Sequence, residues 1–491
     1  MSLITGKFFA FLCILFILYY VIPKKYQWIL LLLGSLFFYL NGPVSHIIFL
    51  IISAVTTYYC GLQVSKNKSK TPIIITILLN IGILFVLKYT APFFDIISYV
   101  TGFKTPKTHF IFPLGISFYT FMIISYIVDV YKGDTEPADN FFQYLLYVCW
   151  FPQIIEGPIN RYKDMKKEFF KGHDFDFERC KYAGYRILIG LFKKVVIAGR
   201  FSVYVDRVFD NVKGYSGLTL FLATVFYVIQ LYTDFSGCMD MVIGISELFG
   251  IRMAENFDRP LFSKSVSEFW RRWHITLGTW FRDYIYYPVF RSAFCKNIKT
   301  KLSKTPLKKS AMNVIAAISL FCVWSLTGLW HGGEMHYILW GLYYAVILIV
   351  SMLLTNKFKK MNKAYPKIFA TKWFDLFRIV RTLFIVTLGE LIFRANTVRD
   401  ALYMIKKIAT DFSLSIGSIQ DGILPFTEDN TAVSYGGVAI VSFIILFIVE
   451  LFAENGKETF KAHKYINAAI LIVATLLFGV FGESGFLYMA Y

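Results

Sequence analysis

The sequence predicts an all-α integral membrane protein, with about 11 or 12 transmembrane helices plus re-entrant segments. The composition is the first observation: 56% of the 491 residues are hydrophobic and only 17% are charged, with a mean hydropathy of +0.55. A soluble globular domain contains roughly 25% charged residues. The second observation is an uncharged stretch, residues 27–65, that is longer than one crossing requires. Third, basic residues cluster between the apolar runs. Such a chain cannot cover its surface with polar groups, so lipid must be much of its solvent.

The individual crossings follow from the length of each apolar run. A bilayer core about 30 Å thick needs about 20 apolar residues in a helix, and Asn41-Gly42-Pro43 divides the uncharged stretch in two. The same reasoning predicts crossings at residues 8–22, 28–41, 44–63, 72–90, 112–130, 186–200, 217–234, 311–329, 336–355, 378–395, 436–452 and 465–482. Residues 141–158 and 278–290 are short or contain Pro and charge, so we expect re-entrant or interfacial segments there.

Charge placement predicts the orientation. The formal net charge is +19, and cytoplasmic loops carry an excess of Lys and Arg. The basic loops are residues 64–71, 159–185, 291–310 and 356–377, whereas residues 411–435 carry acidic residues and no Lys or Arg. The basic loops therefore face the cytoplasm and 411–435 faces outside. Both termini then lie outside, provided that 141–158 returns to the cytoplasm. Arg399, Lys406 and Lys407 oppose this scheme.

The domain organisation is simple. We find no internal repeat and no linker, so residues 1–491 form one integral membrane domain in the cytoplasmic (inner) membrane, with core motifs at 110–345 and C-terminal helices at 378–491. Basic residues confined to short loops indicate membrane orientation, and nucleic acid is excluded as a partner.

The residues that suggest chemistry lie between 230 and 345. Ionisable groups at membrane depth are costly and are functional candidates by default. They include Asp234, the segment Glu268-Phe-Trp-Arg-Arg272-Trp-His274, and Arg282-Asp283. The alternative is an interfacial helix with snorkelling arginines and an aromatic belt, which explains the Trp and Arg residues well but explains Asp234 poorly.

His331 is the most specific candidate. Trp330-His331-Gly332-Gly333 ends an uncharged run that begins at Ala311. Two glycines allow a tight turn and close approach of a ligand to the backbone, and histidine is suited to move protons near neutral pH. A structural histidine at a helix end is the alternative reading.

Several reaction classes lack support. The sequence contains no HExxH and no CxxC, so we predict no metal site. It also contains no GxSxG and no Walker loop, so neither a covalent serine mechanism nor an ATP-driven pump is indicated.

The motifs together resemble the membrane-bound O-acyltransferase (MBOAT) family. The bacterial branch that acetylates alginate or peptidoglycan, or D-alanylates teichoic acid, is the most similar. The resemblance rests on Asp234-Phe-Ser-Gly with Asp240, Glu268-Phe-Trp-Arg-Arg-Trp-His274, Arg282-Asp283-Tyr, Trp330-His331-Gly, Pro113-Leu-Gly-Ile-Ser-Phe118, Asp129-Val-Tyr-Lys-Gly133, Phe151-Pro-Gln153, Gly157-Pro158 and Phe393-Arg394-Ala395. Glu156 and Glu390 depart from the branch's usual pattern, and both could bear on substrate or partner choice.

This resemblance implies a fold and a site. The fold is a ring of tilted helices around a central funnel or tunnel. His331 would be the family's invariant histidine and His274 the second histidine of this branch. Tyr488 lies in an aromatic C-terminal motif that has been proposed to relay the acyl group, although an interfacial anchor explains the motif equally well. The residues expected to support the donor side are Asp234, Arg272, Arg282, Asp283 and Trp330.

The resemblance also implies a reaction. An acyl group, expected to be acetyl, would pass from a cytoplasmic thioester donor to an extracytoplasmic polysaccharide or peptidoglycan. The donor would be acetyl-CoA or an acyl-carrier protein, no cofactor would be bound, and a separate transferase outside the membrane would be the partner. The alternatives are D-alanyl transfer to teichoic acid, acylation of a membrane lipid, and a transporter, although we find no inverted repeats to support the last.

Overall fold

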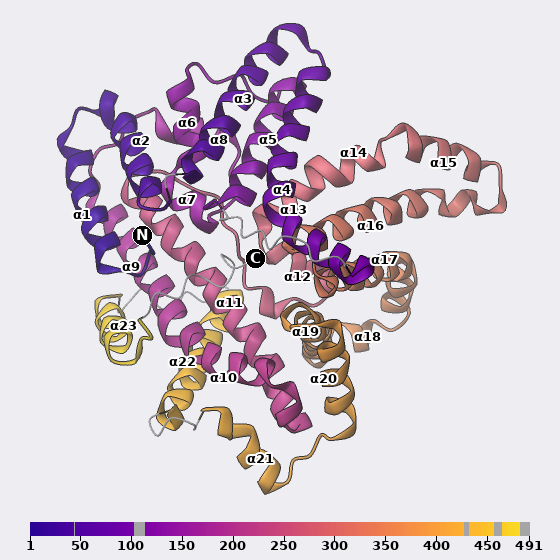
Figure 1. Ribbon diagram of the computed structural model, residues 1–491. Coiled ribbons are helices and arrows are strands. Elements are labelled where there is room, and N and C mark those ends of the chain that lie inside the picture. Colours follow the sequence, from indigo (N-terminus) through magenta and orange to yellow (C-terminus); the bar gives the residue numbers. More distant parts are fainter. Residues whose placement is uncertain (44, 103–112, 427–431, 456–463, 482–491) are drawn as a thin grey trace. The chain divides into compact units, whose positions relative to one another are not determined.

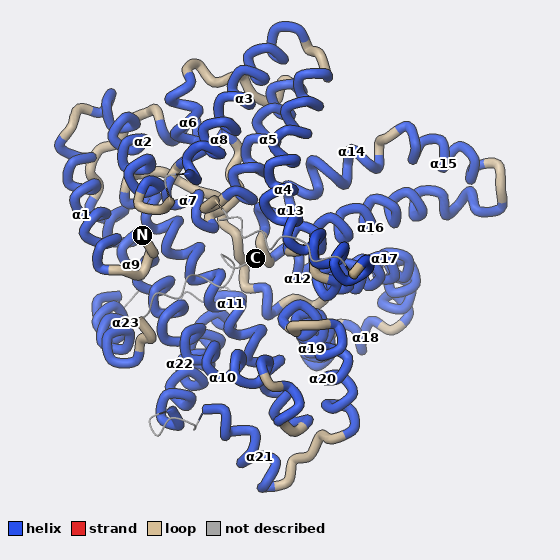
Figure 2. Tube along the Cα trace, in the orientation of Figure 1, coloured by secondary structure: helices blue, strands red, loops and turns tan. Residues whose placement is uncertain are grey.

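Helices form all the regular structure of the described residues (Figure 2). The computed structural model describes residues 1–43, 45–102, 113–426, 432–455 and 464–481. The chain contacts gather into two compact units, each assembled from separate stretches of sequence.

The first unit comprises Met1–Phe192, Phe235–Glu255 and Phe481–Tyr491. Its helices are α1 (Gly6–Val21), α2 (Lys24–Leu40), α3 (Ser45–Asn67), α4 (Thr71–Thr101), α5 (Ile116–Lys132), α6 (Phe141–Cys149), α7 (Phe151–Glu156), α8 (Tyr162–Phe169), α9 (Phe177–Phe192) and the second part of α11 (Gly217–Leu248) (Figure 1). Helix α3 packs against α4, α5 and α6, and α2 packs against α1, α6 and α7.

The second unit comprises Lys193–Asp234 and Asn256–Val480. Its α-helices are α10 (Gly199–Asp210), the first part of α11, α12 (Val266–Arg272), α13 (Ile275–Phe281), α14 (Tyr287–Phe290), α15 (Ala293–Ser303), α16 (Ala311–His331), α17 (Met335–Ala364), α18 (Pro366–Phe369), α19 (Lys372–Arg394), α20 (Val398–Thr410), α21 (Ile416–Ile423), α22 (Ala432–Glu454) and α23 (Lys464–Phe478). The short π and 3-10 elements are η1 (Lys193–Ala198), η2 (Val212–Gly214), η3 (Pro260–Phe262), η4 (Arg282–Tyr286), η5 (Pro306–Ser310) and η6 (Leu424–Phe426).

Within the described residues, each predicted crossing overlaps helical structure. Among the described residues, six helical stretches are long and apolar enough to span a bilayer: His46–Asn67, Thr71–Thr90, Gly217–Leu248, Pro306–His331, Met335–Ala364 and Gly436–Glu454. The helices Gly6–Val21 and Ala468–Phe478 are shorter and apolar. These findings confirm an all-α membrane protein, while the ring with a central funnel stays a prediction.

Helix α11 is longer than the predicted crossing at 217–234, because it continues to Leu248. The charges that argued for an end are compensated inside the protein. Asp234 pairs with Lys194, and the Asp240 carboxylate lies 3.2 Å from the Arg186 guanidinium. A paired charge can therefore stay within the helix.

The segment 141–158 forms two short helices, α6 and α7, instead of one crossing. The helix breaks at Trp150, before Pro152, and every residue from 144 to 160 is buried. Tyr144 is the first residue of this buried stretch, and its hydroxyl lies 2.8 Å from the Thr57 hydroxyl. Because protein covers the break, its backbone polar groups are shielded from lipid.

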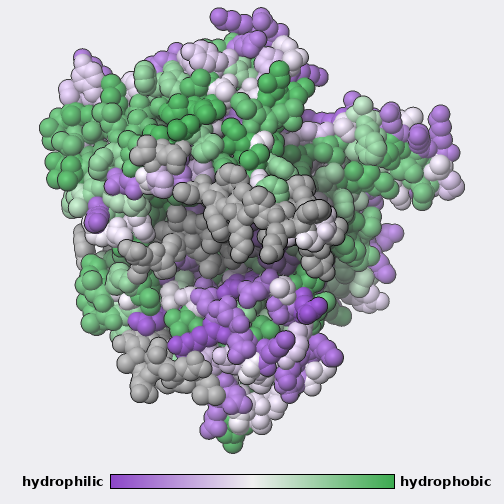
Figure 3. Space-filling model, in the orientation of Figure 1, coloured by the Kyte–Doolittle hydropathy of each residue, from purple (hydrophilic) through white to green (hydrophobic). Residues whose placement is uncertain are grey.

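Large apolar side chains are exposed on the surface of the membrane helices. Figure 3 shows them gathered over α1, α2 and α3. They include Ile14, Ile17, Val21, Leu33, Phe37, Ile48 and Tyr59. A surface of this kind is stable against hydrocarbon, where no polar cover is needed.

Candidate active site

His331 is the last residue of α16, and its side chain is buried. Aromatic rings enclose it: ring centroids lie at 4.6 Å for Trp330, 5.1 Å for Trp340 and 4.9 Å for Phe393. The Trp340 and Phe393 rings stand nearly perpendicular to the imidazole, at 83° and 89°. Two further helices, α17 and α19, therefore fix the ring plane of a histidine that the sequence placed only at a helix end.

Glycines allow the close approach of α16 and α17 that makes this cage. A Cβ on Gly341 would lie 2.4 Å from the Trp324 carbonyl oxygen, and one on Gly328 would lie 2.6 Å from the Tyr337 carbonyl oxygen. Small residues at a helix crossing let backbones meet in membranes. Gly332 follows His331, and a Cβ there would lie 2.4 Å from the Tyr337 ring. The turn after His331 thus accepts only glycine without rearrangement.

The aromatic cluster continues from His331 towards the second histidine. Trp340 contacts His331 and also contacts Trp270 of α12, at 5.7 Å between centroids. Trp270 packs in addition on Trp324 at 4.9 Å and on Tyr344 at 4.8 Å. Hence α12, which leads to His274, is tied to the helices that hold His331.

His274 precedes α13 in a left-handed conformation, with φ 47°. Positive φ is uncommon for residues other than glycine, although asparagine, aspartate and histidine adopt it several-fold more often than the others, and residues held there cluster at functional sites. An isolated antiparallel bridge between Phe257 and Trp273 holds the segment. Two backbone hydrogen bonds flank it, from Asp258 N to Arg272 O at 2.9 Å and from Ile275 N to Asn256 O at 3.0 Å. His274 is therefore fixed by a neighbouring strand-like segment.

Asn256 determines the tautomer of His274. Its Oδ1 accepts hydrogen bonds from the Thr276 backbone N–H at 3.0 Å and the Thr276 hydroxyl at 2.9 Å, and it lies 3.1 Å from His274 Nδ1. A backbone N–H can only donate, so this atom is the amide oxygen and Nδ1 donates to it. Burial lowers the pKa of His274 to about 3. At neutral pH the ring is uncharged, and Nε2 carries the lone pair.

Comparison with known proteins gives the family. The 408 aligned residues of a protein named probable alginate O-acetylase AlgI, from Pseudomonas aeruginosa, are 34% identical and cover 81% of this chain and 72% of the relative. Residues 138–303 match the family model described as MBOAT, membrane-bound O-acyltransferase family. The chain belongs to the membrane-bound O-acyltransferase family. It is accordingly an acyltransferase, and the transporter alternative loses its basis.

Two other relatives of this acyltransferase differ in how much of the chain they match. The peptidoglycan O-acetyltransferase of Helicobacter pylori is 27% identical over 532 aligned positions, covering 98% of this chain and 95% of the relative. The teichoic acid D-alanyltransferase of Bacillus subtilis is 32% identical over 294, covering 59% of this chain and 70% of the relative. The branch predicted from the motifs is thereby confirmed.

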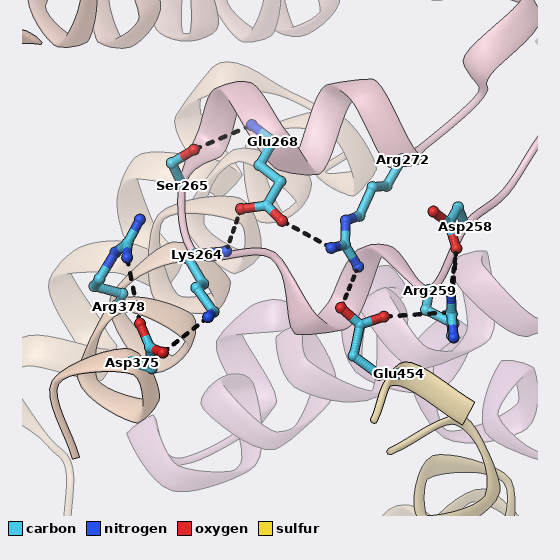
Figure 4. Close-up of polar contacts among 9 residues, drawn as sticks. All are labelled: Asp258, Arg259, Lys264, Ser265, Glu268, Arg272, Asp375, Arg378 and Glu454. Carbon is cyan, nitrogen blue, oxygen red and sulfur yellow. Dashed lines mark hydrogen bonds and ion pairs between the residues drawn. The ribbon is translucent and has the colours of Figure 1, made fainter. Parts of the chain in front are cut away.

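Arg272 belongs to a charge network that anchors α12 of the acyltransferase (Figure 4). Its guanidinium lies 2.8 Å from Glu268 and 2.9 Å from Glu454, and Glu454 also lies 3.3 Å from Arg259. Glu268 has a second task, because the Ser265 hydroxyl accepts from its backbone N–H at 3.1 Å while its carboxylate accepts from Lys264 N at 3.0 Å. Together these bonds cap the start of α12 in the manner of a capping box, with the carboxylate bonded to the residue before the N-cap Ser265. In this structure Arg272 orients the segment before His274.

Asp234 lies in a second buried polar group. It pairs with Lys194 of the π-helical element η1, and the hydroxyl of the nearby Tyr232 donates to Glu450 at 2.7 Å. The Tyr232 ring also lies 6.1 Å from Trp273, beside His274. Asp234 thus joins α11 to η1 through a buried ion pair, and its supporting role on the donor side stays a prediction.

The positions of the other predicted residues do not assign them a role. Arg282 and Asp283 pair with each other at 2.9 Å in η4, with Arg282 exposed and Asp283 half-buried, and their donor-side role stays a prediction. Trp330 is half-buried beside His331. Tyr488 falls outside the described residues, and its relay role also stays a prediction.

Sequence reasoning missed two kinds of residue. Asn256 was visible in the motif region, but nothing in its spacing from His274 signals a hydrogen bond. The sequence gives Trp340 only as an apolar position of a crossing, and Phe393 only as part of the motif Phe393-Arg394-Ala395, without a link to His331. Only the packing of α16, α17 and α19 brings them to His331.

Proposed function

We propose that this acyltransferase moves an acetyl group from a cytoplasmic thioester to an extracytoplasmic cell-surface polysaccharide or peptidoglycan. The observation that carries the proposal is the 98% coverage of this chain by the match to a peptidoglycan O-acetyltransferase. The match to a teichoic acid D-alanyltransferase covers 59% and leaves much of the chain unaccounted for. The site of action is the cytoplasmic membrane.

His331 is the general base of the proposed reaction. Its imidazole takes the proton of an acceptor hydroxyl as that oxygen attacks the thioester carbonyl carbon. The C–O bond forms, the C–S bond breaks, and the leaving thiolate takes a proton from the imidazolium. A positioned base supplies roughly 10²- to 10⁴-fold of rate. The perpendicular Trp340 and Phe393 rings hold the imidazole in one plane, which fixes the direction of proton transfer.

His274 serves the donor side. With Nδ1–H bonded to Asn256, its Nε2 is the acceptor atom, so it can receive a hydrogen bond from a donor thiol or amide. The φ of 47° shows that the backbone holds it in a costly conformation. Arg272 supports this segment through Glu268 and Glu454.

The donor, acceptor and partner complete the proposal. The donor is acetyl-CoA or an acetylated carrier protein, and no resident cofactor takes part because a thioester is already activated. The acceptor hydroxyl belongs to Tyr488 in a relay, to a serine of a partner, or to the glycan. A separate transferase outside the membrane passes the group to the polymer.

A cellular assay tests this function. Cells of the source organism lacking the gene are complemented with the wild-type chain or with His331→Ala, and alkali-released acetate and D-alanine are measured on purified cell-surface polymers. The proposal predicts acetate restored by the wild type alone. Restored D-alanine without acetate would replace acetyl transfer by D-alanylation, and restored acetate with His331→Ala would remove His331 from the mechanism.

A further inference from the structure

Glu390 is a buried carboxylate on α19, within an apolar stretch of that helix. Its Oε1 accepts a hydrogen bond from Trp340 Nε1 at 3.4 Å and lies 3.4 Å from the Tyr344 hydroxyl, whose single proton it shares with the Val386 carbonyl oxygen at 3.4 Å. Both donors belong to α17. Among the described residues, no basic side chain forms an ion pair with it. The carboxylate is therefore held by two aromatic donors.

These two donors are walls of the aromatic cluster around His331. Trp340 lies 5.1 Å from His331 between ring centroids. Tyr344 lies 5.3 Å from Trp340 and 4.8 Å from Trp270. Phe393 follows Glu390 by nearly one turn of α19 and contacts His331 at 4.9 Å. Residues of one helical turn thus approach His331 in two ways, Phe393 by direct contact and Glu390 through Trp340.

Gly389, the residue before Glu390, allows α19 to approach α17 closely enough for these bonds. A Cβ on Gly389 would lie 2.4 Å from the Tyr344 hydroxyl oxygen. Glycine therefore lets α19 come close enough for Glu390 to reach Tyr344. A second bond joins the same helices, from the Tyr343 hydroxyl to the Ile385 carbonyl oxygen at 2.7 Å, and it does not involve the carboxylate.

Stability alone does not account for Glu390. Burying a carboxylate without a basic partner is costly, because hydrogen bonds from neutral donors do not fully replace its lost hydration. What the carboxylate adds is orientation, because it accepts from Trp340 Nε1 and so restrains the ring about its χ angles. The ring it restrains is the one that stands at 83° to the imidazole of His331.

We propose that Glu390 is a positioning residue that fixes the Trp340 and Tyr344 walls of the His331 cage. The expected effect of Glu390 on kcat rests on the proposed function, in which His331 is the base. The orientation of the His331 ring does not depend on that function, since the cage restrains the ring whatever the reaction is.

Three variants of the full-length protein separate this role from simple packing. Glu390→Gln keeps a carbonyl acceptor, and Glu390→Met keeps the volume but removes the acceptor. Tyr343→Phe is the matched control, because it deletes an α17–α19 hydrogen bond without touching Glu390. Expression level and thermal midpoint in detergent are recorded for each.

Two readouts are measured on each variant. The first is kcat and donor KM for acetyl transfer, where misplacing a reacting group by about 1 Å can cost about 100-fold in rate. The second is the rate of His331 carbethoxylation by diethyl pyrocarbonate, followed by peptide mass analysis, which requires no catalysis. We expect Glu390→Met to lower kcat by that factor with KM unchanged and to change the carbethoxylation rate, while Glu390→Gln and Tyr343→Phe stay near the wild type.

The outcomes that overturn the proposal are distinct from failure of the proposed function. Wild-type kcat and wild-type carbethoxylation in Glu390→Met would overturn it, as would equal loss in Glu390→Met and Tyr343→Phe. If the wild type transfers no acetyl group, the proposed donor is wrong. The carbethoxylation rates of Glu390→Met and Glu390→Gln then decide the positioning role alone, and equal rates would reject it.

Discussion

At the scale of residues, two buried histidines have different surroundings. His331 is enclosed by aromatic rings, and Trp340 and Phe393 set its plane. His274 is fixed by polar contacts, with Asn256 Oδ1 as the acceptor for Nδ1. The first arrangement suits a base that must meet an acceptor hydroxyl, and the second suits a hydrogen-bond acceptor of defined direction.

His331→Ala should abolish most transfer without unfolding the protein. Because a positioned general base contributes roughly 10²- to 10⁴-fold, we expect a loss of that size in kcat. His336→Gln is the control, since His336 is also buried, near the start of α17. Initial rates with equal amounts of protein provide the measurement, and equal losses in both variants would point to packing instead of catalysis.

Asn256→Asp should shift the acidic limb of the pH–rate profile upwards. In the wild type, burial lowers the pKa of His274 to about 3, so the ring stays neutral above about pH 4. A carboxylate accepting from Nδ1 favours the imidazolium and raises that pKa. Protonation then removes the Nε2 lone pair at mildly acidic pH. Profiles between pH 5 and 8 test this, and superimposable curves would show that Nε2 is not used as an acceptor.

Part of the site could be predicted from the sequence. His331 stood out because an uncharged helix ended there and two glycines followed. The hydrogen bond between Asn256 and His274 could not be predicted, because it depends on the short bridge between Phe257 and Trp273. The ion pair between Arg272 and Glu454 could not be predicted either, since Glu454 lies far along the chain and contacts Arg272 only in the folded protein.

At the scale of elements, helix crossings at glycine build the site. Gly328 and Gly341 let α16 and α17 approach at the level just before His331. The same device recurs at Gly389, where α19 meets Tyr344. Side chains at these positions would push the helices apart and open the aromatic cage.

Gly341→Ala should destabilise the acyltransferase and reduce activity together. The added Cβ would lie 2.4 Å from the Trp324 carbonyl oxygen, and overpacking typically costs about 1–3 kcal/mol. Gly437→Ala of α22 is the matched control, because nothing lies within 4 Å of its Cβ. Thermal midpoints in detergent compare the two. A midpoint for Gly341→Ala equal to that of the control would mean that the crossing tolerates separation.

Apolar length predicted where the helices lie but less well where they end. The predicted crossing at 217–234 stopped at charges that are paired in the structure, so α11 continues to Leu248. For 141–158, the short apolar length and the presence of Pro and charge predicted a re-entrant or interfacial segment, and the structure has two short buried helices there. Ends depend on which charges find partners, and a single sequence does not show those partners.

At the scale of the whole molecule, charge should determine orientation. The exposed lysines of α15 and η5 in the second unit belong to a segment without acidic residues, as expected of a cytoplasmic loop. The family and membrane character were readable because composition and distributed motifs survive without knowledge of contacts. The central funnel stays a prediction from the family resemblance, because it depends on how tilted helices pack.

Membrane orientation can be checked with single cysteines in a background where all seven cysteines are replaced. Ser415 and Lys360 are both exposed, and the positive-inside rule places them on opposite sides. Ser415→Cys should react with an impermeant maleimide in intact cells, and Lys360→Cys should react only after permeabilisation. The reverse pattern would invert the topology and place both termini in the cytoplasm.

The central claim is that this acyltransferase uses His331 to transfer an acetyl group from a thioester. Its most direct test incubates the purified, reconstituted protein with radiolabelled acetyl-CoA and compares the wild type with His331→Ala and Tyr488→Phe. We expect the wild type to release free CoA and to transfer the label, and both to depend on His331. Tyr488 is required only if the relay operates. Undiminished CoA release and label transfer by His331→Ala would contradict it.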